Sequence, residues 1–296
     1  MPYVFGPVPS RRLGNSLGID PVPLKTCNWN CVYCQLGRTS PLTNERRDFY
    51  PPDEIVAEVA QSLRAHGPGE IDWVTFVGSG EPTLHASLGR MIRQVKALTA
   101  IPVAVVTNGS LLYQKAVRDE LQAADAVLPS LDAGSPALYR TINRPHPHCS
   151  FQRLVDGLAG FRASFRGKLW VEVMLVNSLN DSEPALRDIA AILTRISADQ
   201  IHISSPTRPP VELWVAPTGE EGRSRAQAIF GKSALPLNPT AGSLDLSRFE
   251  NAVDALVTIV SRHPMEESEL IQALHRWPPA RVRDLLAQLS ASGNVQ

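Results

Sequence analysis

Residues 18–34 read Gly-Ile-Asp-Pro-Val-Pro-Leu-Lys-Thr-Cys-Asn-Trp-Asn-Cys-Val-Tyr-Cys. Cys27, Cys31 and Cys34 form a C-x3-C-x2-C motif that follows a predicted strand at residues 18–25. A loop after a strand of a parallel sheet lies at the carboxyl end of that strand, where α/β barrels place their chemistry. The motif therefore predicts a metal or cofactor site at that edge of the sheet.

The rest of the chain carries the pattern of such a sheet. From residue 71 to residue 205, short apolar runs rich in Val and Ile alternate with longer helical patterns, which is typical of consecutive βα units. The predicted strands span residues 18–25, 73–77, 103–107, 126–130, 170–176 and 200–204. The predicted helices span residues 52–65, 87–98, 111–123, 151–165 and 183–196. This α/β pattern predicts a partial (β/α)6 barrel.

A second, smaller domain is predicted at the C-terminus. Residues 205–242 are rich in Pro, Gly and Ser and predict a linker, so we divide the chain into a core at residues 1–243 and a domain at residues 244–296. Helical patterns at residues 249–262, 266–275 and 280–290 resemble a winged-helix module with a short wing. Helical spacing predicts an ordinary core on the last helix, at Val282, Leu285, Leu286 and Leu289.

Composition restricts the classes of partner. Lys plus Arg equals Asp plus Glu at 29 each, so no overall charge attracts nucleic acid or an anionic membrane. The first ten residues lack the pattern of a signal peptide, and no apolar run reaches the ~18 residues of a spanning helix. We therefore expect a cytoplasmic protein that does not bind membranes. In a reducing compartment, four cysteines with three clustered indicate metal ligands instead of disulfides.

The number of thiols in the motif favours an iron-sulfur cluster. A [4Fe-4S] cluster normally takes four cysteine ligands, so three leave one iron open to another ligand. An open position is typical of catalytic metal sites. The alternatives are a zinc site and a group of inert buried thiols. Zinc needs a fourth ligand, such as Asp, Glu, His or Cys149, and structural zinc motifs usually pair two C-x2-C units.

The motif resembles that of the radical S-adenosylmethionine (SAM) superfamily, which usually has an aromatic residue before the third cysteine, here Tyr33. The resemblance implies that SAM fills the open iron position. It also implies reductive cleavage of SAM to a 5'-deoxyadenosyl radical, which abstracts hydrogen from a substrate that the sequence does not identify. The cofactors expected from the resemblance are therefore a [4Fe-4S] cluster and SAM.

Further strand ends resemble the SAM-binding positions of this superfamily. Residues 78–83, Gly78-Ser79-Gly80-Glu81-Pro82-Thr83, resemble its glycine-glycine-glutamate element, in which Glu81 would lie near the SAM ammonium group. Helix caps and turns select the same residue types, so a structural role is the alternative. The other strand-end residues that the resemblance assigns to SAM are Thr107, Asn108, Ser130 and Asp132.

A longer resemblance covers about the first 210 residues. Residues 5–14, 16–20, 23–27, 76–84 and 141–146 are similar to a subgroup related to the wybutosine-synthesis enzymes. Those enzymes are expected to carry a second cluster, for which this chain has only Cys149 to spare. We therefore do not expect wybutosine synthesis. We expect an external electron donor such as flavodoxin or ferredoxin, because the chain has no room for a donor domain.

Several basic residues are candidates for the substrate side of the site. Arg12, Lys25, Arg144 and His146, with Arg11 and Arg208, fall in predicted loops and could bind a phosphate or carboxylate. The alternative is that each forms a salt bridge or lies on a solvated face. Cys149 lies near two histidines, although a lone cysteine is more often buried or free.

The substrate class remains open between RNA, protein and small molecules. One alternative function is a tRNA- or RNA-modifying radical SAM enzyme. Another is a non-catalytic iron-sulfur sensor that binds nucleic acid through its C-terminal domain. Residues 246–296 contain five arginines against six acidic residues, which argues against a phosphate-binding surface there.

Overall fold

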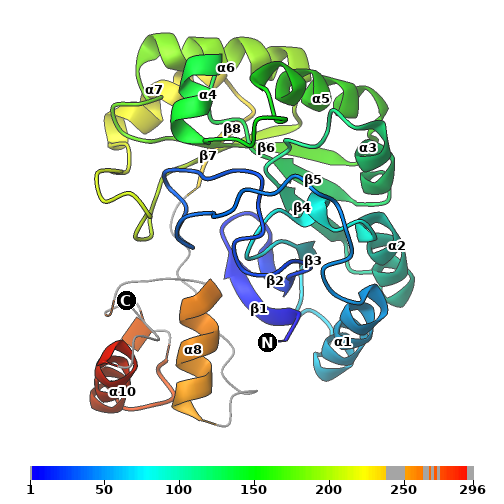
Figure 1. Ribbon diagram of the computed structural model, residues 1–296, viewed down its shortest axis with the longest axis vertical. Coiled ribbons are helices and arrows are strands. Elements are labelled where there is room, and N and C mark those ends of the chain that lie inside the picture. The colour runs from blue at the N-terminus through cyan, green and yellow to red at the C-terminus, as the bar shows by residue number, and fades with distance from the viewer. Residues whose placement is uncertain (1, 238–250, 263–266, 268–269, 272–273, 292–296) are drawn as a thin grey trace.

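The computed structural model describes the whole chain except residues 1, 238–250, 263–266, 268–269, 272–273 and 292–296. Eight strands form one sheet in chain order, from β1 to β8 (Figure 1). β1 pairs antiparallel with β2, and every later pair of neighbours is parallel. The strands are β1 (Val4–Ser10), β2 (Gly14–Ile19), β3 (Trp73–Phe76), β4 (Val103–Thr107), β5 (Ala126–Pro129), β6 (Lys168–Met174), β7 (Gln200–Ser204) and β8 (Ala234–Pro236).

Helices cover the outside of the curved sheet (Figure 1). They are α1 (Pro52–Ala65), α2 (Leu88–Leu98), α3 (Lys115–Leu121), α4 (Pro136–Ile142), α5 (Phe151–Ser164), α6 (Glu183–Ile196) and α7 (Glu220–Phe230), with a short 3-10 helix at Pro82–Leu84. Apolar spacing orients each helix. In α2, for example, Leu88, Met91, Ile92 and Val95 recur on one face and are fully buried.

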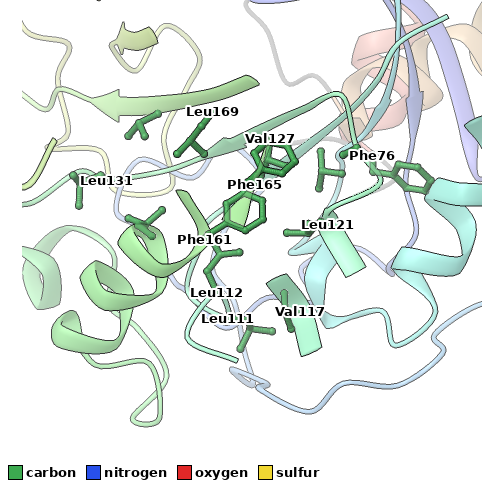
Figure 2. Close-up of a cluster of buried hydrophobic side chains, with 14 of the residues drawn as sticks. Phe76, Leu111, Leu112, Val117, Leu121, Val127, Leu131, Phe161, Phe165 and Leu169 are labelled. Atoms are coloured by element: carbon green, nitrogen blue, oxygen red, sulfur yellow. The ribbon is translucent and has the colours of Figure 1, made fainter. Parts of the chain in front are cut away.

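The main core lies between this helical layer and the sheet. Phe161 of α5 and Phe165, which caps its C-terminus, stack with ring centroids 4.5 Å apart. They belong to the buried cluster that also contains Val127 of β5 and Leu169 of β6 (Figure 2). The core fills the space between the helices and the sheet. The loops at the carboxyl edge of the sheet lie outside this core and can therefore form a site.

The predicted α/β class with a parallel sheet is confirmed, with corrections at its start. The first parallel strand covers Gly14–Ile19 instead of residues 18–25, because Pro21 and Pro23 cannot donate hydrogen bonds to a ladder. β1 was not predicted, because Pro7 and Pro9 argue against a strand; as an edge strand it tolerates them. The predicted helix at residues 111–123 is shorter, at Lys115–Leu121.

The predicted linker is partly wrong. Residues 205–242 contain α7 and β8, and β8 pairs with β7 through Ile201 and Ala234. α7 is largely polar, so its sequence resembles a linker, although Ala226 and Phe230 are buried. The sheet thus extends to Pro236, while the boundary predicted near residue 244 lies outside the described residues.

Two helices are described in the C-terminal part, α8 (Ala252–Arg262) and α10 (Pro279–Ala291). The predicted helix at residues 266–275 and the wing at residues 293–295 lie partly or wholly outside the described residues. The predicted core of the last helix is confirmed: Val282 is fully buried, and Leu285, Leu286 and Leu289 pack against its cluster. Among the described residues, no helix has the length and apolarity to cross a membrane.

Candidate active site at the carboxyl edge of the sheet

The loop that contains Cys27, Cys31 and Cys34, called the cysteine loop below, follows β2 and is hydrogen-bonded to the loop after β3. The backbone N–H of Lys25 donates to the carbonyl of Ser79 at 2.6 Å, and that of Glu81 donates to the carbonyl of Thr26 at 2.9 Å. A Cβ on Gly80 would lie 2.0 Å from the Thr26 oxygen, so only glycine allows this approach. Lys25 itself adopts a left-handed backbone with φ of 61°. The two loops therefore form one unit.

Each motif sulfur accepts a side-chain hydrogen bond. Asn108 Nδ2 lies 3.7 Å from Cys27 Sγ, Asn143 Nδ2 lies 3.7 Å from Cys31 Sγ, and Lys25 Nζ lies 3.0 Å from Cys34 Sγ. The backbone N–H of Trp29 also donates to Cys27 Sγ at 3.4 Å. N–H donors around sulfur stabilise the negative charge of thiolate ligands and tune an iron-sulfur cluster.

The three thiols can serve as metal ligands. Burial and Glu81 raise the pKa of Cys27 to about 12, and burial and Asp132 raise the pKa of Cys31, so both need a metal to become thiolates. All three thiols are free, and their N–H donors suit a cluster.

Tyr33 and Asp132, both predicted at the SAM site, contact each other. Tyr33 Oη donates to Asp132 Oδ2 at 2.6 Å, and Asn143 Nδ2 donates to the same oxygen at 2.6 Å. The backbone N–H of Met174 donates to Asp132 Oδ1 at 2.9 Å. Burial raises the pKa of Asp132 to about 6, although these hydrogen bonds lower it. The cysteine motif is thereby joined to the ends of β5 and β6.

The glycine-rich element after β3 is hydrogen-bonded to the loop after β2. Asp20 accepts from the backbone N–H of Ser79 at 3.1 Å and from its hydroxyl at 2.5 Å. Gly78 has φ of +145°, and a Cβ there would lie 2.3 Å from Asp20 Oδ1. The glycines thus allow two loops of the chain to approach closely. The sequence interpretation considered only the approach of a ligand to these glycines.

Glu81, predicted near the SAM ammonium group, accepts four hydrogen bonds from the protein. Its Oε1 accepts from the Thr83 backbone at 3.0 Å, the Thr83 hydroxyl at 2.5 Å and the Thr107 hydroxyl at 2.6 Å, while Oε2 accepts from the Asn108 backbone at 2.7 Å. It is 2% exposed. Glu81 and Thr107 therefore hold the ends of β3 and β4 together.

Arg12, in the turn between β1 and β2, forms a salt bridge with an acidic residue of the sheet. It contacts Glu172 of β6, which also accepts from the Ser204 hydroxyl at 2.8 Å. Burial would raise the pKa of Glu172, but Arg12 and Ser204 hold it below its usual value. Ser130 forms an isolated parallel bridge with Glu172, which places this pair near the predicted SAM residues.

The other basic candidates also have partners. Arg144 pairs with Glu212, and Arg11 donates to Thr207 at 3.3 Å. Arg208 donates to Gln35 at 3.1 Å, in the cysteine loop. The backbone N–H of His146 donates to the carbonyl of Asn28 at 2.8 Å, and its ring packs against His148. Arg12 and Arg144 therefore form salt bridges, as the alternative interpretation of these basic residues expects.

Cys149 is a buried thiol whose sulfur is hydrogen-bonded to two asparagines. Its Sγ donates to Asn44 Oδ1 at 3.2 Å and accepts from Asn28 Nδ2 at 3.6 Å. Burial raises its pKa to about 11. This matches the alternative in which a lone cysteine is simply buried.

Three site residues were missed from sequence: Asn143, Glu172 and Glu212. Asn143 lies in the segment at residues 141–146 that resembles the subgroup, but nothing assigned it a sulfur contact. Glu172 interrupts the apolar strand Leu-Trp-Val-Glu-Val-Met, and an acidic residue inside a buried strand is a usable signal. Glu212 carries no such signal, since it lies in a Pro-rich loop.

Comparison with known proteins identifies the family of this chain. Residues 22–189 match the family model described as the radical SAM superfamily. That match includes the cysteine loop and the strand ends around it, and it covers more than half of the chain. The protein belongs to the radical SAM superfamily and, within it, to the UPF0026 proteins.

Relatives were found by sequence and by structure. A UPF0026 protein of Methanocaldococcus jannaschii is 35% identical over 93% of this chain and 87% of its own length. A Brachyspira hyodysenteriae protein named GTPase Obg is 36% identical over 99% of this chain, which spans 43% of that protein. The structure of TYW1 with a lysine-pyruvate adduct bound is similar in fold, with a TM-score of 0.56, 18% identity and 74% coverage of both chains.

Proposed function

We propose that Cys27, Cys31 and Cys34 hold a [4Fe-4S] cluster that, when reduced, cleaves SAM to methionine and a 5'-deoxyadenosyl radical for hydrogen abstraction. The observation that carries the proposal is that each of the three sulfurs accepts an N–H from a different side chain. Asn108 follows β4, Asn143 caps the C-terminus of α4 and Lys25 lies in the cysteine loop, so the fold itself builds the environment that thiolate ligands need.

The surrounding strand ends supply polar groups for SAM. Ser130 and Asp132 follow β5, Tyr33 of the cysteine loop donates to Asp132, and the backbone of residues 78–80 lies against the cysteine loop. We assign these groups to SAM, together with Asn108. We assign Glu81 and Thr107 to the same set, where their mutual hydrogen bond holds the ends of β3 and β4 in place. The electron comes from an external donor such as flavodoxin or ferredoxin, and the cytoplasm is the proposed location.

The test is formation of 5'-deoxyadenosine by the anaerobically reconstituted chain with dithionite and SAM. Wild type should form it, and Cys31→Ala should not. Cys149→Ala is the matched control, because Cys149 is buried near the site but contacts no motif sulfur; it should keep full iron content and product formation. Cell-extract fractions that raise the yield would indicate whether the substrate is RNA, protein or a small molecule.

An intact cluster with bound SAM that yields no product, with any fraction, would contradict catalysis. A non-catalytic iron-sulfur sensor would then be the better account, and strongly salt-dependent nucleic-acid binding would support it.

A further inference from the structure

Two adjacent apolar side chains, Leu213 and Trp214, project from the surface beside the cysteine loop. Leu213 is 98% exposed and Trp214 is 54% exposed. They belong to residues 205–217, which we call the capping segment. Single exposed apolar residues are common, but two stand next to each other here, and aromatic residues such as Trp are enriched at protein interfaces.

The capping segment is bonded directly to the cysteine loop. The backbone N–H of Val211 donates to the carbonyl of Cys34 at 3.1 Å, and Arg208 reaches Gln35. Val215 is buried in a small cluster with Val32, which lies between Cys31 and Cys34. Figure 1 draws the segment in yellow-green next to the blue loops. Leu213 and Trp214 are therefore two and three residues from a hydrogen bond to a motif cysteine.

Glu212 fixes the conformation of this pair. It is 9% exposed and pairs with both Arg38 and Arg144. The hydrogen bond from Arg144 lowers the pKa of Glu212, with further contributions from Arg38 and Trp214. A surface loop that is already held in place loses little entropy when a partner binds.

Cationic side chains predominate in the contacts of the capping segment. Its contacts include three arginines, Arg38, Arg144 and Arg208, and one carboxylate, that of Glu212. The side chain of Arg38 is 66% exposed and that of Arg144 is 36% exposed. An apolar centre with a cationic rim complements a partner with an apolar patch surrounded by acidic residues.

We propose that Leu213 and Trp214, with Arg38 and Arg144 at the rim, form the docking surface for an acidic electron-carrier protein of the flavodoxin type. The carrier is oxidised by one electron and the site is reduced by one electron, and no covalent bond forms or breaks. This inference rests on the proposed function, because it assigns a contact surface to the external donor. The surface suits that role because electron transfer requires a donor close to the cysteine loop.

The experiment measures reduction of the reconstituted full chain by reduced flavodoxin, followed anaerobically by absorbance. Leu213→Ser combined with Trp214→Ala should lower the second-order rate at least tenfold. The rate with dithionite, which needs no docking, and the iron content should stay unchanged. The matched control is Leu98→Ser, because Leu98 is 47% exposed but ends α2 at the amino edge of the sheet. Arg38→Gln should weaken the salt dependence of the flavodoxin rate.

An unchanged flavodoxin rate in the double variant would overturn the proposal. Equal losses with flavodoxin and dithionite would also overturn it, since the segment would then support the site and not a partner. If the rate with flavodoxin is normal while added substrate fractions lose their effect, the surface binds the substrate instead. The reduction assay is independent of SAM cleavage, so absence of 5'-deoxyadenosine would contradict only the proposed function.

Discussion

Asn143 Nδ2 lies 3.7 Å from Cys31 Sγ and 2.6 Å from Asp132 Oδ2, so a single amide group connects the cysteine motif to the end of β5. Asn143 caps the C-terminus of α4 and is fully buried. Its position therefore depends on α4, a helix of seven residues, packing next to the cysteine loop. The environment of the sulfur is thus set by an element far from the motif in the sequence.

Replacing Asn143 should lower the reduction potential of the cluster. An N–H donor to sulfur stabilises the more negative, reduced state, so Asn143→Ala removes that stabilisation. A hydrogen bond of about 1 to 1.4 kcal/mol corresponds to a shift of about 40 to 60 mV to more negative values for one electron. A redox titration followed by electron paramagnetic resonance measures it.

The matched control for this change is Asn44→Ala. Asn44 contacts Asn28 and Cys149 and no motif sulfur, so its replacement should leave the potential in place. Equal potentials in wild type and Asn143→Ala, at equal iron content, would show that the amide does not act on the cluster.

Gly80→Ala should reduce the amount of iron that the chain holds. The added Cβ would lie 2.0 Å from the Thr26 carbonyl, a backbone atom next to Cys27, so the cysteine loop must shift. Such overpacking typically costs about 1 to 3 kcal/mol. Iron and sulfide analysis after reconstitution measures the effect. Gly219→Ala is the control, because a Cβ there meets no atom within 4 Å; if both variants load equally, the close approach is unimportant.

The location of the site was predictable because parallel topology fixes where loops lie. Cys27, Glu81, Asn108 and Asp132 each follow a strand, and the carboxyl ends of parallel strands share one edge. What these residues contact was not predictable in the same way. The bond between Tyr33 and Asp132 joins positions 99 residues apart, and it depends on how the loops fold back over that edge.

Two elements of the fold, β1 and α7, could not be predicted from their local sequence. β1 contains two prolines, and its strand character comes from pairing with β2 at an edge. α7 buries only Gly222, Ala226 and Phe230, so its apolar face is too narrow to separate it from a Gly- and Ser-rich linker. In both cases tertiary contacts decide the structure.

Breaking the pair between Arg12 and Glu172 should destabilise the fold more than removing both members. The Glu172 side chain is 8% exposed and that of Arg12 is 18% exposed, so Arg12→Met leaves a largely buried carboxylate without its cation. We expect a loss of about 2 to 4 kcal/mol in the free energy of unfolding. Arg12→Met combined with Glu172→Leu should recover much of it. Denaturant unfolding of the four proteins forms the cycle, and purely additive losses would contradict the coupling.

The stability of the fold should fall in mild acid because of His202. This side chain is 3% exposed and packs against Trp170 with ring centroids 5.6 Å apart. Burial, with a contribution from Arg12, lowers its pKa to about 4. The native state therefore binds the proton less tightly than the unfolded state, whose pKa is about 6.5.

For a group with a lowered pKa, the stabilising contribution is present above pH 6.5 and is lost as the pH falls from 6.5 to 4. The full difference corresponds to about 3 kcal/mol. His202→Gln cannot take up this proton, so the free energy of unfolding of wild type should decrease relative to the variant across that range. Urea unfolding of both proteins at matched pH values, with the cysteines reduced, measures the difference. A constant difference from pH 7.5 to pH 4 would mean that His202 titrates alike in the native and unfolded chains.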